Sequence, residues 1–248
     1  MVSLSLVFPV YKDQHTVRVV AEKAVRLFDS LGARYEVIIV DDGSPDRSGV
    51  VADDIAREHP NVRVIHHETN RGYGAAVRSG FAAAGCDYVC QTDGDDEYDV
   101  DDLRKLLKLH AYYDLIITFR YKKLYSSWRM VVSWIYNGLL RAMFRMPFRD
   151  VSTGLRMVRR EVLEDIALRS DSPFVGAELA IKAMLKGYRV GEVGIQTFPR
   201  TFGRGASVSL RNIIATIRDL WATYREVFSD EYDLPPSRLR RNDRHAEP

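Results

Sequence analysis

Residues 87–97 read DYVCQTDGDDE, a short apolar run that leads directly into a group of acidic side chains. The run predicts a buried strand, and Asp93 and Asp95, two apart in an extended segment, would point to the same side. Carboxylates about 4 Å apart repel by roughly 4 kcal/mol at an effective dielectric near 20, unless a cation or a shared proton lies between them. Mg²⁺ and Mn²⁺ prefer oxygen ligands, and Mg²⁺ keeps positions for water and substrate phosphates. Asp93 and Asp95 are therefore a candidate metal site.

The same acidic residues also fit an ordinary solvated turn and helix start. Seven of the ten residues in 93–102 are acidic. Asp99, Asp101 and Asp102 precede a helical apolar face that begins at Leu103, and acidic residues favour the first turn of a helix. Because the chain holds a second D-x-D at Asp99 and Asp101, the spacing alone is weak evidence. The metal-site prediction depends on its context in the chain.

Length and composition indicate a globular protein. The 248 residues suffice for one large α/β domain or two small ones, and 46% are hydrophobic and 28% charged. A net charge of +2 gives no indication of a nucleic-acid binder. Cys86 and Cys90 have no other metal ligands near them in sequence, which predicts reduced thiols in a cytosolic protein. The sequence also predicts neither a signal peptide nor a membrane-spanning helix.

Strands and helices alternate through the first half of the chain. Strands are predicted at residues 3–9, 35–40, 62–66 and 87–92, and helices at residues 16–31, 46–58 and 74–84. Continuous apolar strands suit a parallel sheet covered on both faces, so the alternation predicts a doubly wound, mostly parallel α/β sheet. Ligands bind such sheets beyond the carboxyl ends of the strands. Polar clusters at residues 9–11, 41–42 and 93–95 all follow strands and should converge on one rim.

Beyond residue 102 the pattern changes. Further strands are predicted at residues 115–119, 155–158 and 188–195, and further helices at residues 161–168 and 178–185. A long basic and aromatic stretch, residues 120–149, lies between the first of these strands and the second. The tail, residues 229–248, is basic and poor in apolar residues, which predicts a flexible segment.

Several short motifs occur in the order and at the spacing of family 2 glycosyltransferases with the GT-A fold, and the chain resembles that family. They are FPVY at residues 8–11, VDDGSPD at residues 40–46, NRGYG at residues 70–74 and DGD at residues 93–95. The second half, with DVSTGLR at residues 150–156, resembles more narrowly the branch of dolichol-phosphate mannosyltransferases and polyprenyl-phosphate glycosyltransferases. The resemblance spans residues 5 to about 210. Lys12 and Asp13 depart from the Asn-Glu that this family usually has.

The resemblance implies one GT-A domain over residues 1–228, with acceptor-side helices near residues 124–148 and 208–228. It implies inverting transfer of a sugar from a GDP- or UDP-hexose to a polyprenyl or dolichyl phosphate. The residues that it places at the nucleotide sugar are Pro9, Tyr11, Asp13, Asp41, Asp42, Gly72, Asp93 and Gly94. Those that it places at a divalent metal, Mg²⁺ or Mn²⁺, are Asp93, Asp95 and Glu97.

The acceptor phosphate calls for cations, because guanidinium groups pair bidentately with phosphate oxygens. The residues that the resemblance places there are Arg120, Arg129, Ser133, Arg156, Arg200 and Ser207. Arg129 and Arg200 join Asp93 and Asp95 as the predicted catalytic residues. A lipid monophosphate has a second pKa near 6, so it is already mostly dianionic at neutral pH and needs no strong general base.

Two segments have features of helices at a membrane surface. Residues 130–148 mix large apolar side chains with arginines. Residues 210–228 carry an apolar stripe, with Arg211, Arg218 and Arg225 recurring every seven residues on another face. The second segment fits equally a helix packed on the core or on a second copy in a homodimer. We expect a peripheral enzyme on the cytosolic face of a membrane that binds no nucleic acid.

Two alternatives stay open at this stage. One is a family 2 enzyme that acts on a saccharide hydroxyl in cell-wall or capsule assembly, which would need a positioned carboxylate as general base. The other is a non-catalytic module that binds a nucleotide sugar. A dinucleotide-binding oxidoreductase is disfavoured, because residues 9–16 contain no glycine and so lack the G-x-G-x-x-G phosphate cradle.

Overall fold

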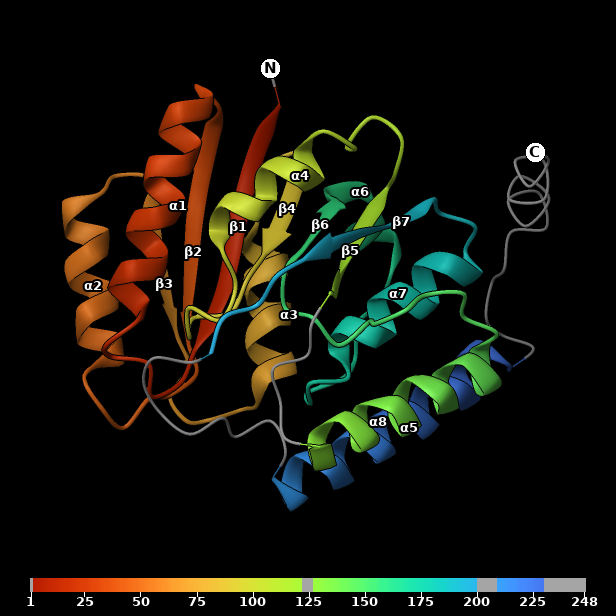
Figure 1. Ribbon diagram of the computed structural model, residues 1–248. Coiled ribbons are helices and arrows are strands. Elements are labelled where there is room, and N and C mark those ends of the chain that lie inside the picture. Colours follow the sequence, from red (N-terminus) through yellow and green to blue (C-terminus); the bar gives the residue numbers. More distant parts are fainter. Residues whose placement is uncertain (1, 122–126, 200–208, 230–248) are drawn as a thin grey trace.

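Seven strands form a central sheet in the computed structural model (Figure 1). The structure describes residues 2–121, 127–199 and 209–229. For residues 127–131 it describes the backbone alone. The strands are β1 (Ser3–Val10), β2 (Arg34–Asp41), β3 (Val62–His66), β4 (Tyr88–Gln91), β5 (Leu115–Arg120), β6 (Arg156–Arg159) and β7 (Val190–Ile195). Their order is β3-β2-β1-β4-β6-β5-β7. All neighbours are parallel except β6, which runs antiparallel to β4 and β5. The predicted doubly wound, mostly parallel sheet is confirmed.

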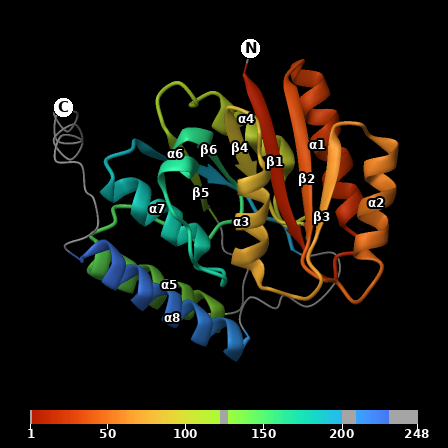
Figure 2. The same cartoon turned by 180° about the vertical axis from the view of Figure 1, so that it is seen from behind.

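Helices cover both faces of this sheet. They are α1 (Val17–Leu31), α2 (Ser48–Glu58), α3 (Tyr73–Ala83), the 3-10 turn η1 (Val100–Asp102), α4 (Leu103–Leu107), α5 (Ser127–Phe144), α6 (Arg160–Asp165), α7 (Val175–Leu185) and α8 (Leu210–Val227). Side chains alternate along β1, so Leu6 and Phe8 join a core cluster with α1, α2 and α4, whereas Val7 joins a second cluster with α3, α6 and α7. Figure 2 shows this second face.

The strand order reverses beside β1. The chain runs from β1 outward through β2 to β3, and then returns to place β4 on the other side of β1. In open α/β sheets such a reversal leaves a crevice at the carboxyl ends of the strands. The ends of β1, β2 and β4 meet there.

Two predicted elements in the second half differ from the structure. The helix predicted at residues 161–168 ends at Asp165, because the Glu178 carboxylate accepts the backbone N–H groups of Arg169 and Ser170 and holds the following loop in a non-helical path. The helix predicted from residue 178 already begins at Val175. The predicted flexible tail, apart from Ser229, lies outside the described residues.

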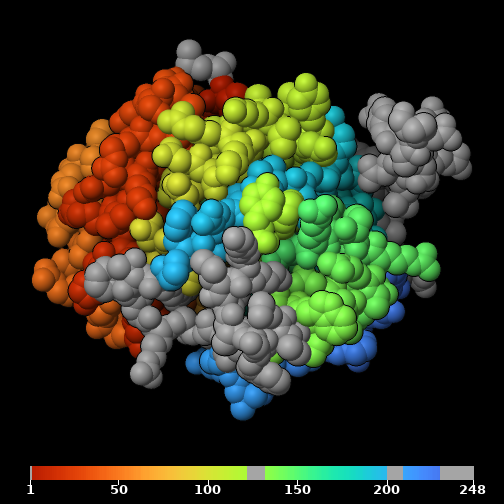
Figure 3. All heavy atoms as spheres, viewed as in Figure 1, coloured from red at the N-terminus to blue at the C-terminus, as the bar shows by residue number. Residues whose placement is uncertain are grey.

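Helices α5 and α8 lie side by side along one edge of the molecule (Figures 1 and 2). The ring of Phe144 at the end of α5 packs against Tyr224 and Phe228, with centroids 5.8 and 6.2 Å apart. One face of α8 is buried against the body through Leu220 and Val227. Side chains of both helices reach the same lower edge of the surface in Figure 3.

A buried ion network ties α8 to α7. Lys182 is only 1% exposed, and its Nζ donates to Glu178 at 2.7 Å and to both carboxylate oxygens of Glu226 at 3.0 Å. It also donates to the Ala167 carbonyl at 2.6 Å. Glu178 is fully buried and is therefore an internal residue of this network.

Replacing Lys182 with methionine is expected to lower the free energy of unfolding by about 3–5 kcal/mol, because two carboxylates would lose the cation that offsets their burial. Urea unfolding followed by circular dichroism measures this change. Lys186→Met is the matched control, since Lys186 pairs with the exposed Asp165 at 2.9 Å. A solvated pair contributes about 1 kcal/mol or less. Equal losses in the two variants would contradict the structural role of the network.

Candidate active site

The carboxyl ends of β1, β2 and β4 are joined by backbone hydrogen bonds. The N–H of Asp42 donates to the Val10 carbonyl at 3.0 Å, and the N–H of Thr92 donates to the Val7 carbonyl at 3.1 Å. The hydroxyl of Thr16 donates to the Gly94 carbonyl at 2.7 Å. The three polar clusters expected from the alternation of strands therefore lie on one rim of the sheet.

The segment after β1 turns sharply at this rim. Lys12 has a φ of 64°, and the N–H of Tyr11 donates to an Asp13 carboxylate oxygen at 3.1 Å. A Cβ on Gly94 would lie 2.9 Å from the Pro9 carbonyl oxygen and 3.6 Å from Asp13, so glycine permits this close approach. Pro9, Tyr11, Asp13 and Gly94, all predicted at the nucleotide sugar, are thus brought together.

Asp41 is 6% exposed and hydrogen-bonded on both carboxylate oxygens. The N–H of Ser44 donates to Oδ1 at 3.1 Å, and His66 Nδ1 lies 3.0 Å from Oδ2. His66 Nε2 lies 3.0 Å from Asp53. Partial burial lowers the pKa of His66, but the hydrogen bonds to Asp53 and Asp41 outweigh it, and its pKa is raised overall. The His66 ring thus bridges Asp41 and Asp53.

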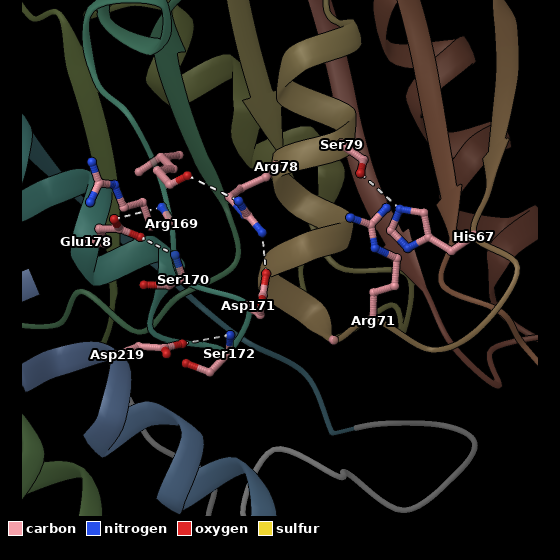
Figure 4. Close-up of polar contacts among 12 residues, drawn as sticks. His67, Arg71, Arg78, Ser79, Arg169, Ser170, Asp171, Ser172, Glu178 and Asp219 are labelled. Carbon is pink, nitrogen blue, oxygen red and sulfur yellow. Dashed lines mark hydrogen bonds and ion pairs between the residues drawn. The ribbon is translucent and has the colours of Figure 1, made fainter. Parts of the chain in front are cut away.

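Asp42 holds the turn that carries Gly72. Its Oδ1 accepts the N–H of Arg71 at 2.8 Å and lies 2.7 Å from His67 Nδ1, and its Oδ2 accepts the N–H of Gly72 at 2.9 Å. His67 Nε2 in turn contacts Ser79 on α3 at 2.9 Å (Figure 4). Since Asp42 is 3% exposed, it orders residues 70–72 from within the protein.

The two predicted metal ligands follow β4 directly. Asp95 is 4% exposed, and its Oδ1 accepts the N–H of Glu97 at 3.0 Å. Asp93 is partly exposed, and its Oδ1 accepts the Tyr73 hydroxyl at 2.6 Å. A Cβ on Gly154 would lie 2.5 Å from Asp93 Cγ and Oδ1, so the carboxylate rests directly against this glycine.

The carboxylates of Asp93 and Asp95 are suitable ligands for a hard divalent cation. Asp93 and Asp95 offer carboxylate oxygens, and the Asp93 carboxylate occupies the position that a side chain at residue 154 would need. Two carboxylates leave most of an octahedral shell to water and diphosphate oxygens, as Mg²⁺ prefers. Within the described ranges no three histidine, cysteine, aspartate or glutamate side chains converge as a metal cluster. Glu97 contacts Asp95 through its backbone N–H.

Two of the predicted phosphate-binding arginines are internal. The Arg120 side chain donates to Asp150 through Nε at 3.0 Å and Nη2 at 2.7 Å. Arg156, in β6, is 3% exposed, and its Nη2 donates to the Thr153 carbonyl. Its Nε and Nη1 have no hydrogen-bond partner among the residues described. Burial lowers the pKa of Arg156, while the nearby Tyr73 and Asp93 act in the opposite direction.

The other predicted acceptor residues lie on α5 or outside the described residues. Ser133 lies on α5, where Asn137 Nδ2 donates to its carbonyl at 2.8 Å. Arg129 lies on the same helix, but its side chain is outside the described part, as are Arg200 and Ser207.

The sequence alone did not indicate that Tyr73 and Gly154 are neighbours of Asp93. The contact of Gly154 follows from strand pairing: antiparallel β4 and β6 set Gln91 opposite Arg156, which brings residue 154 opposite residue 93. Gly154 within DVSTGLR could have indicated a close approach of two segments. The register of β4 and β6 was needed to identify Asp93 as the residue that it approaches. Tyr73 follows Gly72 at the start of α3, in a motif that predicted only a turn.

Comparisons with known proteins identify the family of the chain. The family model described as Glycosyl transferase family 2 matches residues 5–167. An uncharacterized glycosyltransferase of Mycobacterium tuberculosis is 33% identical over 197 residues, covering 77% of this chain and 87% of that protein. Polyprenol monophosphomannose synthase of Mycolicibacterium smegmatis is 33% identical over 183 residues, covering 68% of this chain and 69% of that protein.

Solved structures share the fold. Glucosyl-3-phosphoglycerate synthase of Mycobacterium tuberculosis, crystallised with Mn²⁺, uridine diphosphate and phosphoglyceric acid, superposes with a TM-score of 0.70 at 20% identity. The match covers 90% of this chain and 78% of that one.

In the part of the chain that is described, none of the helices is both long enough and apolar enough to cross a membrane.

Proposed function

Because this chain belongs to glycosyl transferase family 2, we propose that it transfers a hexose from a GDP- or UDP-sugar to a polyprenyl or dolichyl phosphate, with inversion at the anomeric carbon. The observation that carries the proposal is the arrangement of Asp41, Asp93 and Asp95 on one rim, where the carboxyl ends of three strands meet. A lipid phosphate acceptor is supported by the similarity to polyprenol monophosphomannose synthase.

Each part of the rim has a role in this proposal. Asp41 accepts hydrogen bonds from the nucleotide base, and His66 keeps its carboxylate oriented. Pro9, Tyr11 and Gly94 line the nucleotide-sugar site beside it. Asp93 and Asp95 would hold Mg²⁺ or Mn²⁺, which stabilises the negative charge that develops on the leaving diphosphate.

The acceptor phosphate would bind beside the nucleotide-sugar site, on residues from the second half of the chain. A dianionic phosphate is itself the nucleophile, so the protein needs cations to position it and no strong general base. Arg129 and Arg200, with Ser133 and Ser207, supply these contacts in the proposal. Arg156 would add positive charge from the interior, whereas the charge of Arg120 is offset by Asp150.

The edge formed by α5 and α8 would face the membrane that holds the lipid. Trp134 is 77% exposed and Trp221 51%, and Ile214 and Ile217 lie on the same helix as Trp221 with more than half of each side chain exposed to solvent. Exposed arginines accompany them on α8. Apolar side chains flanked by cations suit the surface of an anionic bilayer.

Transfer of a radiolabelled sugar tests the function. Purified protein is mixed with vesicles that contain polyprenyl phosphate, with Mg²⁺ or Mn²⁺, and with labelled GDP-mannose, UDP-glucose or UDP-N-acetylglucosamine in separate reactions. We expect label from one donor to enter the organic phase. Label found only in a water-soluble saccharide would support the hydroxyl acceptor, and donor binding without transfer would support a non-catalytic module.

The same vesicles test the membrane surface separately. We expect the protein to float with vesicles of anionic phospholipid and to be released by high salt, because each basic group near the surface contributes about 1 kcal/mol. Failure to float would contradict membrane contact. Transfer to detergent-dispersed polyprenyl phosphate would then still support the proposed reaction.

A further inference from the structure

The Tyr73 side chain lies between β4 and the Asp93 carboxylate. Its hydroxyl donates to Asp93 Oδ1 at 2.6 Å and accepts the Gln91 amide N–H at 2.8 Å. We propose that Tyr73 is a positioning residue, whose hydroxyl fixes the Asp93 carboxylate in the orientation that binds the catalytic cation. The inference rests on the proposed metal-dependent function and adds to it a residue that acts through a ligand.

The direction of these hydrogen bonds is set by chemistry. The Gln91 amide N–H can only donate, so the Tyr73 oxygen accepts from it and turns its own proton toward Asp93. A phenol is a hydrogen-bond donor at neutral pH, because its ordinary pKa is about 10.

A donor of this kind matters because carboxylates rotate. A ligand oxygen must be held in the correct plane when the cation arrives, and outer hydrogen bonds supply that constraint in metal sites. On its other side the Asp93 carboxylate rests against Gly154. Tyr73 and Gly154 together leave this side chain little freedom to turn.

Tyr73 is itself held in place by the start of α3. It is the first residue of the helix and follows Gly72, whose φ of 104° is accessible mainly to glycine. The N–H of Gly74 donates to the Asp171 carbonyl at 2.9 Å. A Cβ on Gly72 would lie 2.6 Å from that same oxygen, so the helix start is packed directly on residues 170–172.

Residues 169–172 are anchored in turn by two other helices (Figure 4). The Glu178 carboxylate on α7 accepts the N–H groups of Arg169 and Ser170, each at 2.9 Å. Asp219 on α8 accepts the N–H of Ser172 at 3.1 Å. Contacts with α3, α7 and α8 all hold this loop. The first turn of α3, which carries Tyr73, is therefore held in place without a bound ligand.

The test is Tyr73→Phe, which removes the hydroxyl and keeps the ring. Mn²⁺ binding in the presence of GDP or UDP is measured by electron paramagnetic resonance of free Mn²⁺, a readout independent of turnover. We expect the affinity to fall by about 10- to 100-fold, as outer hydrogen-bond partners of metal ligands typically cause. Nucleotide binding in EDTA should change little, and the melting temperature of the metal-free protein should fall by only a few degrees, because the buried Gln91 amide loses its acceptor.

Tyr35→Phe is the matched control. Its hydroxyl also donates to an aspartate, Asp29, at 2.8 Å, at the end of α1 and away from the rim. Wild-type Mn²⁺ affinity in Tyr73→Phe, or an equal loss in both variants, would overturn the inference. If the wild-type protein with nucleotide binds no Mn²⁺, the proposed function fails instead, so the two failures are distinguishable.

Discussion

Replacing Asp95 with asparagine is expected to lower sugar transfer about 1,000-fold while the protein stays folded. Asparagine keeps the shape, and its amide oxygen can still accept the N–H of Glu97, which Asp95 now binds at 3.0 Å. What is lost is the negative charge that holds a divalent cation. Metal stabilisation of a leaving group amounts to several kcal/mol, and each 1.4 kcal/mol is about a factor of ten in rate. Initial rates at saturating donor and metal measure the change.

The second D-x-D of the chain provides the control. Asp99 accepts the N–H of Asp101 at 3.1 Å and caps the 3-10 turn η1, so it has a local structural role. Asp99→Asn changes the same atoms four residues away, and we expect transfer near the wild-type rate. Loss of activity in both variants, or in neither, would contradict the assignment of Asp95 to the metal.

The sheet could be predicted from the sequence because its parallel strands are continuous apolar runs separated by helices. Such runs must be buried on both faces, and this requirement alone gives the order of elements and the rim where residues 41–42 and 93–95 meet. The order of the elements and the position of the rim both follow from apolar patterns within short segments of the chain. The predicted strand at residues 155–158 was also found, but nothing in its sequence indicated that β6 would run antiparallel.

The details around Asp93 could not be predicted, because they depend on pairing between distant segments. Gly154 reaches Asp93 only through the register of β4 and β6. Arg120 was predicted to bind a phosphate, but its partner Asp150 lies thirty residues away, and no local pattern reveals that pair. Arg156 is buried because β6 lies between β4 and β5 within the sheet, which its local sequence did not indicate.

Helix α8 shows how one amphipathic pattern can serve two purposes. The sequence left open a membrane contact, a core contact and a homodimer. The structure buries Leu220 and Val227 against the body, while Ile217 and Trp221, on another side of the helix, stay about half exposed. Asp219 then links this helix to the loop beneath α3. Contact with a bilayer and support of the Asp93 site would therefore involve the same helix.

Replacing Gly154 with alanine is expected to reduce transfer about 100-fold, although it adds only one methyl group. The new Cβ would lie 2.5 Å from Asp93 Cγ and Oδ1, a separation that non-bonded atoms do not tolerate. Since the N–H of Gly154 is bonded to the Tyr98 hydroxyl at 3.0 Å, the backbone resists moving and the carboxylate must shift. A misplacement of about 1 Å in a catalytic group can cost about 100-fold in rate.

Gly85→Ala separates this effect from the general cost of adding a methyl group. A Cβ at Gly85 would meet only a Glu36 oxygen, at an ordinary contact distance of 3.5 Å, so we expect wild-type activity. Mn²⁺ affinity should fall in Gly154→Ala together with the rate, because both depend on the orientation of Asp93. If Gly154→Ala lost activity but kept its Mn²⁺ affinity, Gly154 would act on the substrate directly, and the view that it supports a metal ligand would be wrong.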